Sequence, residues 1–267
     1  MRDLVLGREP EDYDVATDAL PSRVQELFPS SVDVGARFGV ILVVANGAKV
    51  EVATFRSDVG YSDGRHPDRV EYSTSPEEDV RRRDFTINGL MQDMETQEIL
   101  DFVGGREDLQ QGIVRAIGTP EVRFREDRLR MVRAVRFAAR FGYIIEPATF
   151  QAIVAAARHI TAVSAERLRD EITKLLTEGA ARRAFELLDA TGLLKSCLPE
   201  IAGDGAVYVD PRSPSEMAAE LTRLLESPGE RFRLAQMGRT RAECYRWERC
   251  ARESLAFFKE IAANERE

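Results

Sequence analysis

The spacing of apolar residues changes along the chain at a cluster of glycines, Gly104, Gly105 and Gly112. Before this cluster, two β-rich segments at residues 37–44 and 50–55 flank an Asn-Gly pair, the strongest short signal for a hairpin turn. After it, apolar residues recur at helical spacing. The sequence therefore predicts a strand-containing first part and an all-helical remainder, joined near residues 100–115.

The other predicted elements follow from local signals. Residues 13–17 are expected to be the end of a strand, residues 21–28 a short helix, residues 57–76 a mobile polar loop, and residues 79–91 a helix. A break is expected around residues 199–210. Further helices are expected at residues 121–142, 148–159, 164 onward, 214–227 and 229–262, with a pair of helices near 180–195.

Composition narrows the class of protein. Of 267 residues, 43% are hydrophobic and 31% are charged, which is typical of a soluble globular protein. No apolar run approaches the roughly 20 residues of a membrane span, and no secretory signal follows Met1. Three cysteines cannot form a disulfide framework, and two histidines make a His-rich zinc site unlikely. A cytoplasmic location without membrane contact is expected.

Charge is distributed unevenly. Residues 1–114 hold 12 basic and 23 acidic residues, and residues 115–183 hold 14 basic and 8 acidic residues. An acidic part followed by a basic helical part suits a divalent metal in the first and a polyanion near the second. Ordinary variation of surface charge gives the same numbers, so charge alone leaves both interpretations open.

Three carboxylates are candidates for metal binding. Asp12 and Asp14 are two apart, so in an extended segment they point to the same side and can converge on one ion. Glu51 lies on the second strand of the predicted hairpin and can complete a three-acid site. Hard oxygen ligands suit Mg²⁺. Most such acids in proteins are solvated turn or edge residues, which is the alternative here.

Two arginine-rich segments offer donors and acceptors for a nucleotide. In RRDFTIN (residues 82–88), Arg83 can pair with phosphate, Asp84 can accept a hydrogen bond from a ribose hydroxyl, and Asn88 can do either. In the second segment, four charged residues at three-residue spacing form one stripe on a helix, opposite an apolar stripe. The alternative is a solvated helix face, because 34 of the 38 basic residues are arginines. The stripe consists of Asp127, Arg130, Arg133 and Arg136.

Seven segments in order resemble the motifs of class II nucleotidyltransferases, the family of bacterial tRNA CCA-adding enzymes and poly(A) polymerases. RDLVLGR (2–8) resembles the end of the family's opening motif, and DYDVAT (12–17) its metal-binding strand. EVATFR (51–56) resembles the strand with the third carboxylate. RRDFTIN resembles the ribose-selecting motif and DFVGGREDL (101–109) the hinge. EDRLR (126–130) resembles the residues that pair with the incoming base, and SAERLRDE (164–171) a neck helix motif.

The resemblance implies an α+β fold: a polymerase-β-like head, a helical neck and a helical tail. It implies a transfer with Mg²⁺ held by Asp12 and Asp14, assisted by Glu51. Arg2 and Arg83 would bind phosphate or ribose, and Asp84 the ribose 2′-hydroxyl. Asp127 and Arg130 would select CTP or ATP, supported by Arg133 and Arg136. The expected RNA partner is the 3′ end of tRNA, guided by the basic neck.

Two features depart from the family pattern. The chain starts at the family's valine position just before Arg2, so the preceding strand and glycine pair are absent and a truncated start is expected. Residues 203–262 instead resemble the C-terminal end of GT-B glycosyltransferases. The expected domains are a head at residues 1–114, a neck at 115–201 and a tail at 202–267.

Several functions remain open at this point. GARFG (35–39) favours the CCA-adding branch, because the poly(A) polymerases have a more basic segment with a histidine there. A poly(A) polymerase, and CC-adding or A-adding specialists, share the other motifs. A non-catalytic nucleotide-binding or RNA-binding remnant, or a glycosyltransferase fragment, are alternatives of a different kind. The oligomeric state is not predictable from these residues.

Overall fold

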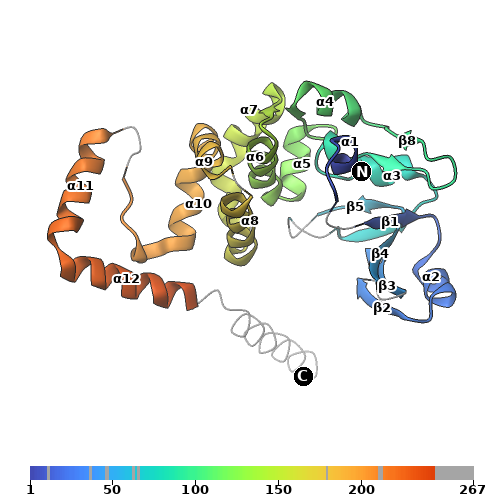
Figure 1. Ribbon diagram of the computed structural model, residues 1–267, viewed down its shortest axis with the longest axis horizontal. Helices are drawn as coiled ribbons and strands as arrows, with labels where there is room; N and C mark the ends of the chain where they lie inside the picture. The colour runs from blue at the N-terminus through green and yellow to red at the C-terminus, as the bar shows by residue number, and fades with distance from the viewer. Residues whose placement is uncertain are drawn as a thin grey trace.

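In the computed structural model, a sheet-containing region is followed by a cluster of helices and then by two outlying helices (Figure 1). The structure describes residues 1–10, 13–35, 38–45, 48–61, 64, 67–178, 180–209 and 213–243. This order matches the expected α+β head followed by helices. Among the described residues, no helix combines the length and apolar character needed to cross a membrane.

The main sheet has four strands in the order β1-β4-β3-β2. The expected hairpin is confirmed: β3 (Val40–Ala45) and β4 (Ala48–Thr54) are antiparallel, although the turn at 46–47 lies outside the described residues. The expected strand end is also confirmed as β1 (Asp14–Thr17), which runs parallel to β4. Strand β2 (Ser31–Gly35), an edge strand paired with β3, was not among the predicted elements.

A short helix covers part of this sheet. Helix α2 (Pro21–Leu27) starts at Pro21, a residue whose fixed φ suits the first turn of a helix. Val24 of α2 is buried with Ile41 and Val43 of β3, which forms a small separate core. This core fixes the sheet that carries the acidic residues.

Two expectations for the region after the hairpin were wrong. Residues 57–76 do not form a loop throughout, because β5 (Arg56–Val59) and β6 (Arg69–Tyr72) pair as antiparallel strands. Strand β5 lacks the apolar alternation of a typical strand. Its charged residues Arg56 and Asp58 instead form an ion pair with each other at 3.0 Å.

The helix expected at residues 79–91 is also wrong. Helix α3 (Pro76–Arg81) ends before the RRDFTIN segment, which contains only the 3-10 turn η2 (Thr86–Asn88). The segment is extended around Phe85 because its backbone pairs with residues 115–117: Thr86 N–H donates to Arg115 O, and Ile117 N–H donates to Asp84 O.

The glycine-rich joint contains three short strands and one helix. Strands β7 (Met91–Gln92) and β8 (Ile99–Leu100) form a small hairpin, and β9 (Ile113–Val114) pairs with β10 (Ile144–Ile145). Helix α4 (Gly105–Gln111) lies between Gly104 and Gly112, both of which have positive φ. The joint is thus an ordered element that connects the sheet region to the helices.

The remaining helices form the neck and the outlying pair. The helix expected over residues 121–142 is two helices, because Asp127 is extended and ends the first of them. The neck comprises α5 (Pro120–Glu126), α6 (Leu129–Phe141), α7 (Pro147–Ala156), η3 (Ala157–Ala162), α8 (Ala165–Thr177), α9 (Ala181–Ala190) and α10 (Leu193–Ala202).

The neck helices share one large hydrophobic core with the end of the head. This core runs from Phe85 to Cys197 and includes the apolar stripe predicted on α6, with Leu129, Val132, Val135 and Ala139 all buried. Met1 and Leu6, on either side of α1 (Arg2–Val5), also pack against it. The core therefore holds the N-terminal segment and the RRDFTIN loop against α6.

The outlying helices bury little. After η4 (Gly203–Gly205), α11 (Pro214–Glu226) and α12 (Pro228–Glu243) follow the expected positions as far as the structure describes them. Leu221, Leu225 and Phe232 are exposed. Helix α12 contacts η4 closely, since a Cβ on Gly205 would lie 2.6 Å from the Cα of Gly238.

Candidate functional site

Two of the three candidate metal ligands are neighbours in the sheet. Asp14 and Glu51 are register partners on the parallel strands β1 and β4, and both side chains are exposed. Asp12 lies outside the described residues. Among the described residues, no cluster of three or more metal-ligating side chains occurs. The two carboxylates supply hard oxygen atoms, so this donor set fits a divalent cation such as Mg²⁺.

The RRDFTIN loop presents a fixed carboxylate and amide. Asp84 Oδ1 accepts hydrogen bonds from Phe85 N–H at 2.8 Å and from Asn88 Nδ2 at 3.0 Å. Asp84 Oδ2 accepts one from Arg133 Nε at 2.9 Å. Burial opposes the ionisation of Asp84, but the charge of Arg133 and these hydrogen bonds outweigh it and lower the pKa of the carboxyl. Asp84 is therefore an ionised acceptor.

Arg2 of α1 and Arg83 of the loop itself both donate to Asn88. Arg2 Nη1 donates to Asn88 Oδ1 at 2.7 Å, and its guanidinium lies over the rings of Phe137 and Phe141. Arg83 Nη1 donates to the backbone carbonyl of Asn88 at 3.3 Å, and its Nη2 donates to Asp79 at 3.0 Å. The structure therefore brings together Arg2, Arg83, Asp84 and Asn88, and their roles in nucleotide binding stay predictions.

The two residues expected to read the base lie at the junction of α5 and α6, and each pairs with a different partner. Asp127 accepts two hydrogen bonds from Arg167 of α8, at 2.8 and 3.3 Å. Arg130 donates to Glu126 at 2.6 Å and to the carbonyl of Arg82 at 3.3 Å. Their hydrogen-bonding groups are thus held in place by neighbouring side chains.

The last two residues of the predicted stripe are less accessible than a solvated helix face. Arg133 reaches across to Asp84 of the head. Arg136 is only 6% exposed, and it donates to Glu171 at 2.8 Å and to Glu178 at 3.0 Å. Arg136 therefore links α6 to α8, and its role in nucleotide binding stays a prediction.

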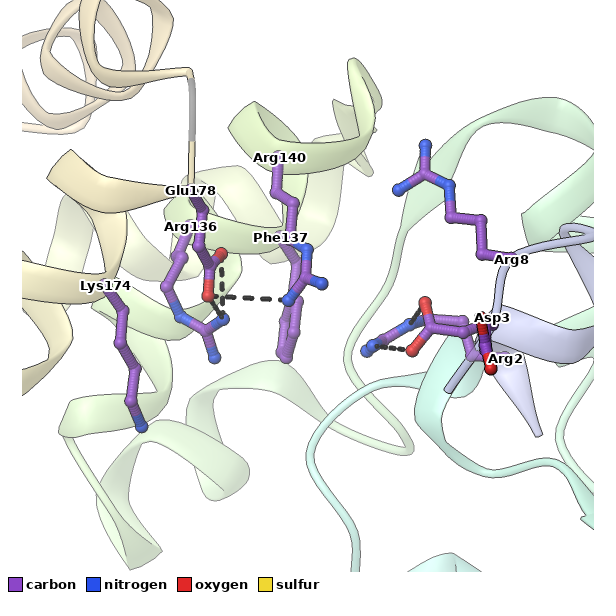
Figure 2. Close-up of a pocket in the computed structure, with 9 residues that line it drawn as sticks. Arg2, Asp3, Arg8, Arg136, Phe137, Arg140, Lys174 and Glu178 are labelled. Atoms are coloured by element: carbon purple, nitrogen blue, oxygen red, sulfur yellow. Dashed lines mark hydrogen bonds and ion pairs between the residues drawn. The ribbon is translucent and has the colours of Figure 1, made fainter. Parts of the chain in front are cut away.

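A polar cleft of about 310 Å³ lies between the N-terminal segment and the neck (Figure 2). Arg2 and Arg8 approach it from one side, while Arg136 and Arg140 of α6 approach from the other. The lining is basic on balance, with five cations and three acids. It consists of Arg2, Asp3, Arg8, Glu9, Arg136, Phe137, Arg140, Lys174 and Glu178.

Sequence reasoning missed a second polar cluster beside the loop. Asp58 of β5 accepts a hydrogen bond from Tyr61 at 2.8 Å, and Arg82 pairs with Asp79 at 2.6 Å and with Asp58 at 3.6 Å. Burial and the bond to Asp58 raise the pKa of Tyr61 to about 12. No local signal could have found this cluster, because Asp58 and Tyr61 lie in a segment that reads as a loop while Asp79 and Arg82 lie in one that reads as a helix.

Comparison with known proteins gives two matching family models. Residues 1–115 match the model described as the poly(A) polymerase head domain. Residues 142–204 match the model described as a probable RNA- and SrmB-binding site of polymerase A. The two models cover the sheet region with α4 and most of the neck.

The chain is also similar to proteins named CCA-adding enzymes. It is 47% identical over 203 residues to the enzyme of Geobacillus stearothermophilus, covering 76% of this chain and 50% of that protein. The crystal structure of the Bacillus stearothermophilus enzyme with CTP matches with 45% identity and a TM-score of 0.64, covering 72% of this chain and 46% of that one. The chain thus spans about half the length of the curated relatives that it matches.

A third match reaches into the outlying helices. The Thermotoga maritima CCA-adding enzyme complexed with tRNA matches with 25% identity and a TM-score of 0.64, covering 86% of this chain and 52% of that one. Residues 1–201 make up only about three quarters of the chain, so this similarity extends past residue 201. The resemblance of residues 203–262 to glycosyltransferases stays a prediction.

Proposed function

Through residues 1–204 the chain belongs to the family of poly(A) polymerases and CCA-adding enzymes, and on that premise we propose that it adds C and A to the 3′ end of tRNA. The nucleotides would come from CTP and ATP, with release of pyrophosphate and without a nucleic-acid template. The observation that carries the proposal is the register pairing of Asp14 and Glu51 on strands β1 and β4 of the head sheet. These substrates imply a cytoplasmic location.

The acidic pair is the proposed metal site. Asp14 and Glu51, together with Asp12 outside the described residues, would hold Mg²⁺. When bound, the metal lowers the pKa of the RNA 3′-hydroxyl and neutralises charge on the triphosphate and the leaving pyrophosphate. The exposure of Asp14 and Glu51 leaves room for water and phosphate oxygens, which Mg²⁺ usually retains among its ligands.

Three sets of side chains would orient the nucleotide. Arg2 and Arg83 would bind phosphate or ribose, and the ionised Asp84 would accept a hydrogen bond from the ribose 2′-hydroxyl. Asp127 supplies acceptors and Arg130 supplies donors, which together can recognise the hydrogen-bonding edge of a base. A site of this kind discriminates well, because the wrong base leaves buried polar groups unpaired.

The polar cleft would receive the phosphates near the RNA 3′ end. Arg8, Arg140 and Lys174 lie along it, and Glu178 balances only part of their charge. Phosphate contacts of this kind give affinity that does not depend on RNA sequence and that falls with salt. The size of the cleft suits one or two nucleotides rather than a duplex.

The test is nucleotide incorporation by the purified full chain with Mg²⁺. The substrates are three tRNAs that end before CCA, after the first C and after CC, each with CTP, ATP or both. Ordered incorporation that stops at CCA supports the proposal. Addition of a long A tail would instead favour a poly(A) polymerase, whose head-domain model this chain matches. Addition of only C, or of a single A, would identify a specialist.

Absence of incorporation has a defined meaning in this experiment. A folded chain that binds CTP and RNA but incorporates nothing would contradict the proposed activity and favour the non-catalytic alternative. A variant with Asp14 replaced by Asn separates specific activity from contamination, because incorporation that persists in that variant cannot come from this site.

A further inference from the structure

The carboxylate of Asp84 in the head is held by a helix of the neck. Arg133 of α6 donates from Nε to Asp84 Oδ2 at 2.9 Å, and Nη2 of the same guanidinium lies 2.7 Å from that oxygen. The other carboxylate oxygen accepts from Phe85 N–H and from Asn88 Nδ2. An ionised carboxylate has about four acceptor positions, so the three hydrogen bonds leave about one position for a further donor.

Arg133 is itself fixed by the neck. Its guanidinium lies 5.3 Å from the ring centroid of Phe137, and its Nη1 lies 3.6 Å from Glu171 of α8. Phe137 in turn packs edge-on against Phe85, the residue after Asp84, with ring centroids 5.9 Å apart. The orientation of Arg133 is therefore set by α6 and α8, while the group that it holds belongs to the head.

We propose that Arg133 is a positioning residue that acts through Asp84, so that the choice of ribose over deoxyribose depends on a neck helix. The inference rests on the proposed function, in which Asp84 accepts a hydrogen bond from the ribose 2′-hydroxyl. Arginine suits this role because its guanidinium is rigid and always charged, so the hydrogen bond from Nε to Asp84 is charge-assisted. This bond can keep the carboxylate aligned while the remaining acceptor position receives the ribose hydroxyl.

The contacts separate this role from base selection. The hydrogen bonds of Arg133 go to Asp84, whereas Asp127 is held by Arg167 and Arg130 is held by Glu126. Loss of Arg133 removes one of the three hydrogen bonds to Asp84, together with the charge beside it, and neither of the bonds from Arg167 to Asp127. We therefore expect the preference for CTP over dCTP to fall while the preference between CTP and ATP is kept.

The experiment compares Arg133→Gln and Arg133→Lys with the matched control Arg182→Gln. Arg182 lies on α9 with a side chain that is 93% exposed. Binding of CTP, dCTP and ATP to the full chain is measured by equilibrium titration, and incorporation of each is measured in parallel. We expect Arg133→Gln to lower the CTP/dCTP ratio about tenfold, the size of one lost charge-assisted hydrogen bond. The CTP/dCTP ratio of Arg133→Lys should lie between those of Arg133→Gln and the wild type, and the ratio of the control should equal that of the wild type.

Two further measurements keep the outcome decisive. Thermal melts show whether each variant is folded. If Arg133→Gln is unfolded, the CTP/dCTP ratio of Arg133→Lys tests the inference. In an Asp84→Asn background, Arg133→Gln should cause no further loss of the CTP/dCTP ratio. An unchanged ratio in a folded Arg133 variant, or a shift in CTP/ATP preference instead, would overturn the inference, as would a wild type that does not discriminate between CTP and dCTP.

The binding measurements also distinguish a failure of this inference from a failure of the proposed function. A wild-type chain that prefers CTP to dCTP but incorporates neither contradicts the proposed activity, while loss of that preference in Arg133→Gln still supports the positioning role. A chain that incorporates CTP normally, with the ratio unchanged in Arg133→Gln, contradicts only the positioning role.

Discussion

Asp14 and Glu51 lie opposite each other on neighbouring strands, and neither is needed to fill the core. We expect Asp14→Asn and Glu51→Gln each to lower incorporation by at least about a hundredfold, since a neutral amide is a poor ligand for a divalent cation. Melting temperatures should stay close to wild type because both side chains are exposed. Glu95→Gln, an exposed carboxylate elsewhere in the head, is the control. Activity retained in either variant would refute the metal assignment.

Arg130 is the residue whose loss should affect base choice. In Arg130→Ala, Glu126 keeps its ion pair with Arg123 at 2.9 Å, so the junction of α5 and α6 should remain folded. We expect the ratio of kcat/KM for CTP and ATP to move about tenfold towards equality, because the donors proposed to recognise the base are lost. The CTP/dCTP ratio should change little. Unchanged base selectivity would count against the proposed role of Arg130.

At the residue scale, the sequence indicates which residues carry chemistry better than it indicates their partners. Asp14 and Glu51 stand out as acids in segments with recognisable strand patterns, and the structure adds that these strands pair. The contact between Arg133 and Asp84 joins residues 49 apart, and neither shows in its own segment that the other is its partner. Arg136 looks like part of a solvated stripe, and it is buried only because Glu171 and Glu178 come from another helix.

At the scale of elements, the packing of helix α4 against the RRDFTIN loop depends more on Gly105 than on the neighbouring Gly104. A Cβ on Gly105 would lie 2.2 Å from the backbone oxygen of Thr86, so Gly105→Ala must push α4 away from the RRDFTIN loop. Gly104 has φ of 78° and open space around it. We expect Gly105→Ala to cost about 3 kcal/mol of unfolding free energy, and Gly104→Asn well under 1 kcal/mol, since asparagine tolerates this conformation. Urea unfolding measures both, and equal costs would contradict the close approach.

The start of α4 should also make stability depend on pH. Asp101 accepts hydrogen bonds from the backbone N–H groups of Val103, Gly105 and Arg106. Burial raises the pKa of Asp101, but these bonds outweigh it, so the pKa is lowered on folding. A lowered pKa adds stability that is present above the unfolded value, near 4, and lost as pH falls through the folded value. The stability advantage of wild type over Asp101→Asn should therefore be constant from pH 7 to about 5 and shrink below pH 4. An advantage that persists at pH 2 would show that ionisation is not its source.

Elements set by local pattern were predictable, and elements set by distant pairing were not. The β3–β4 hairpin carries alternating apolar residues around an Asn-Gly turn, and α6 carries a clear apolar stripe. The RRDFTIN segment has good helix formers before it, yet Phe85 is drawn into a bridge with Ala116, which lies beyond the joint. The paired strands β5 and β6 were not predicted either. Their side chains are largely polar, and they pair across residues that read as a loop.

At the scale of the whole molecule, the expected boundary between head and neck near residue 114 does not coincide with a gap in the core. The large core includes Phe85, Ile87 and Leu109 from the head side and continues through the neck to Cys197. The sheet instead has its own small core around Ile41. Folding units are defined by shared apolar burial rather than by sequence motifs, so residues 85–114 are expected to unfold with the neck.

Because the two cores are separate, a substitution in one core should lower the stability of the elements that share that core and not of the others. Ile87 and Ile41 are both fully buried isoleucines of the head, and truncation to alanine should cost each core about 2–5 kcal/mol. In native-state hydrogen exchange, Ile87→Ala should lower the opening free energy of α9 amides by nearly the full cost, because α9 packs in the same core. Ile41→Ala should lower protection in β3 and β4 and leave α9 unchanged. If α9 is equally protected in both variants, the neck folds independently of residues 85–114, and the sequence boundary at 114 marks the unit instead.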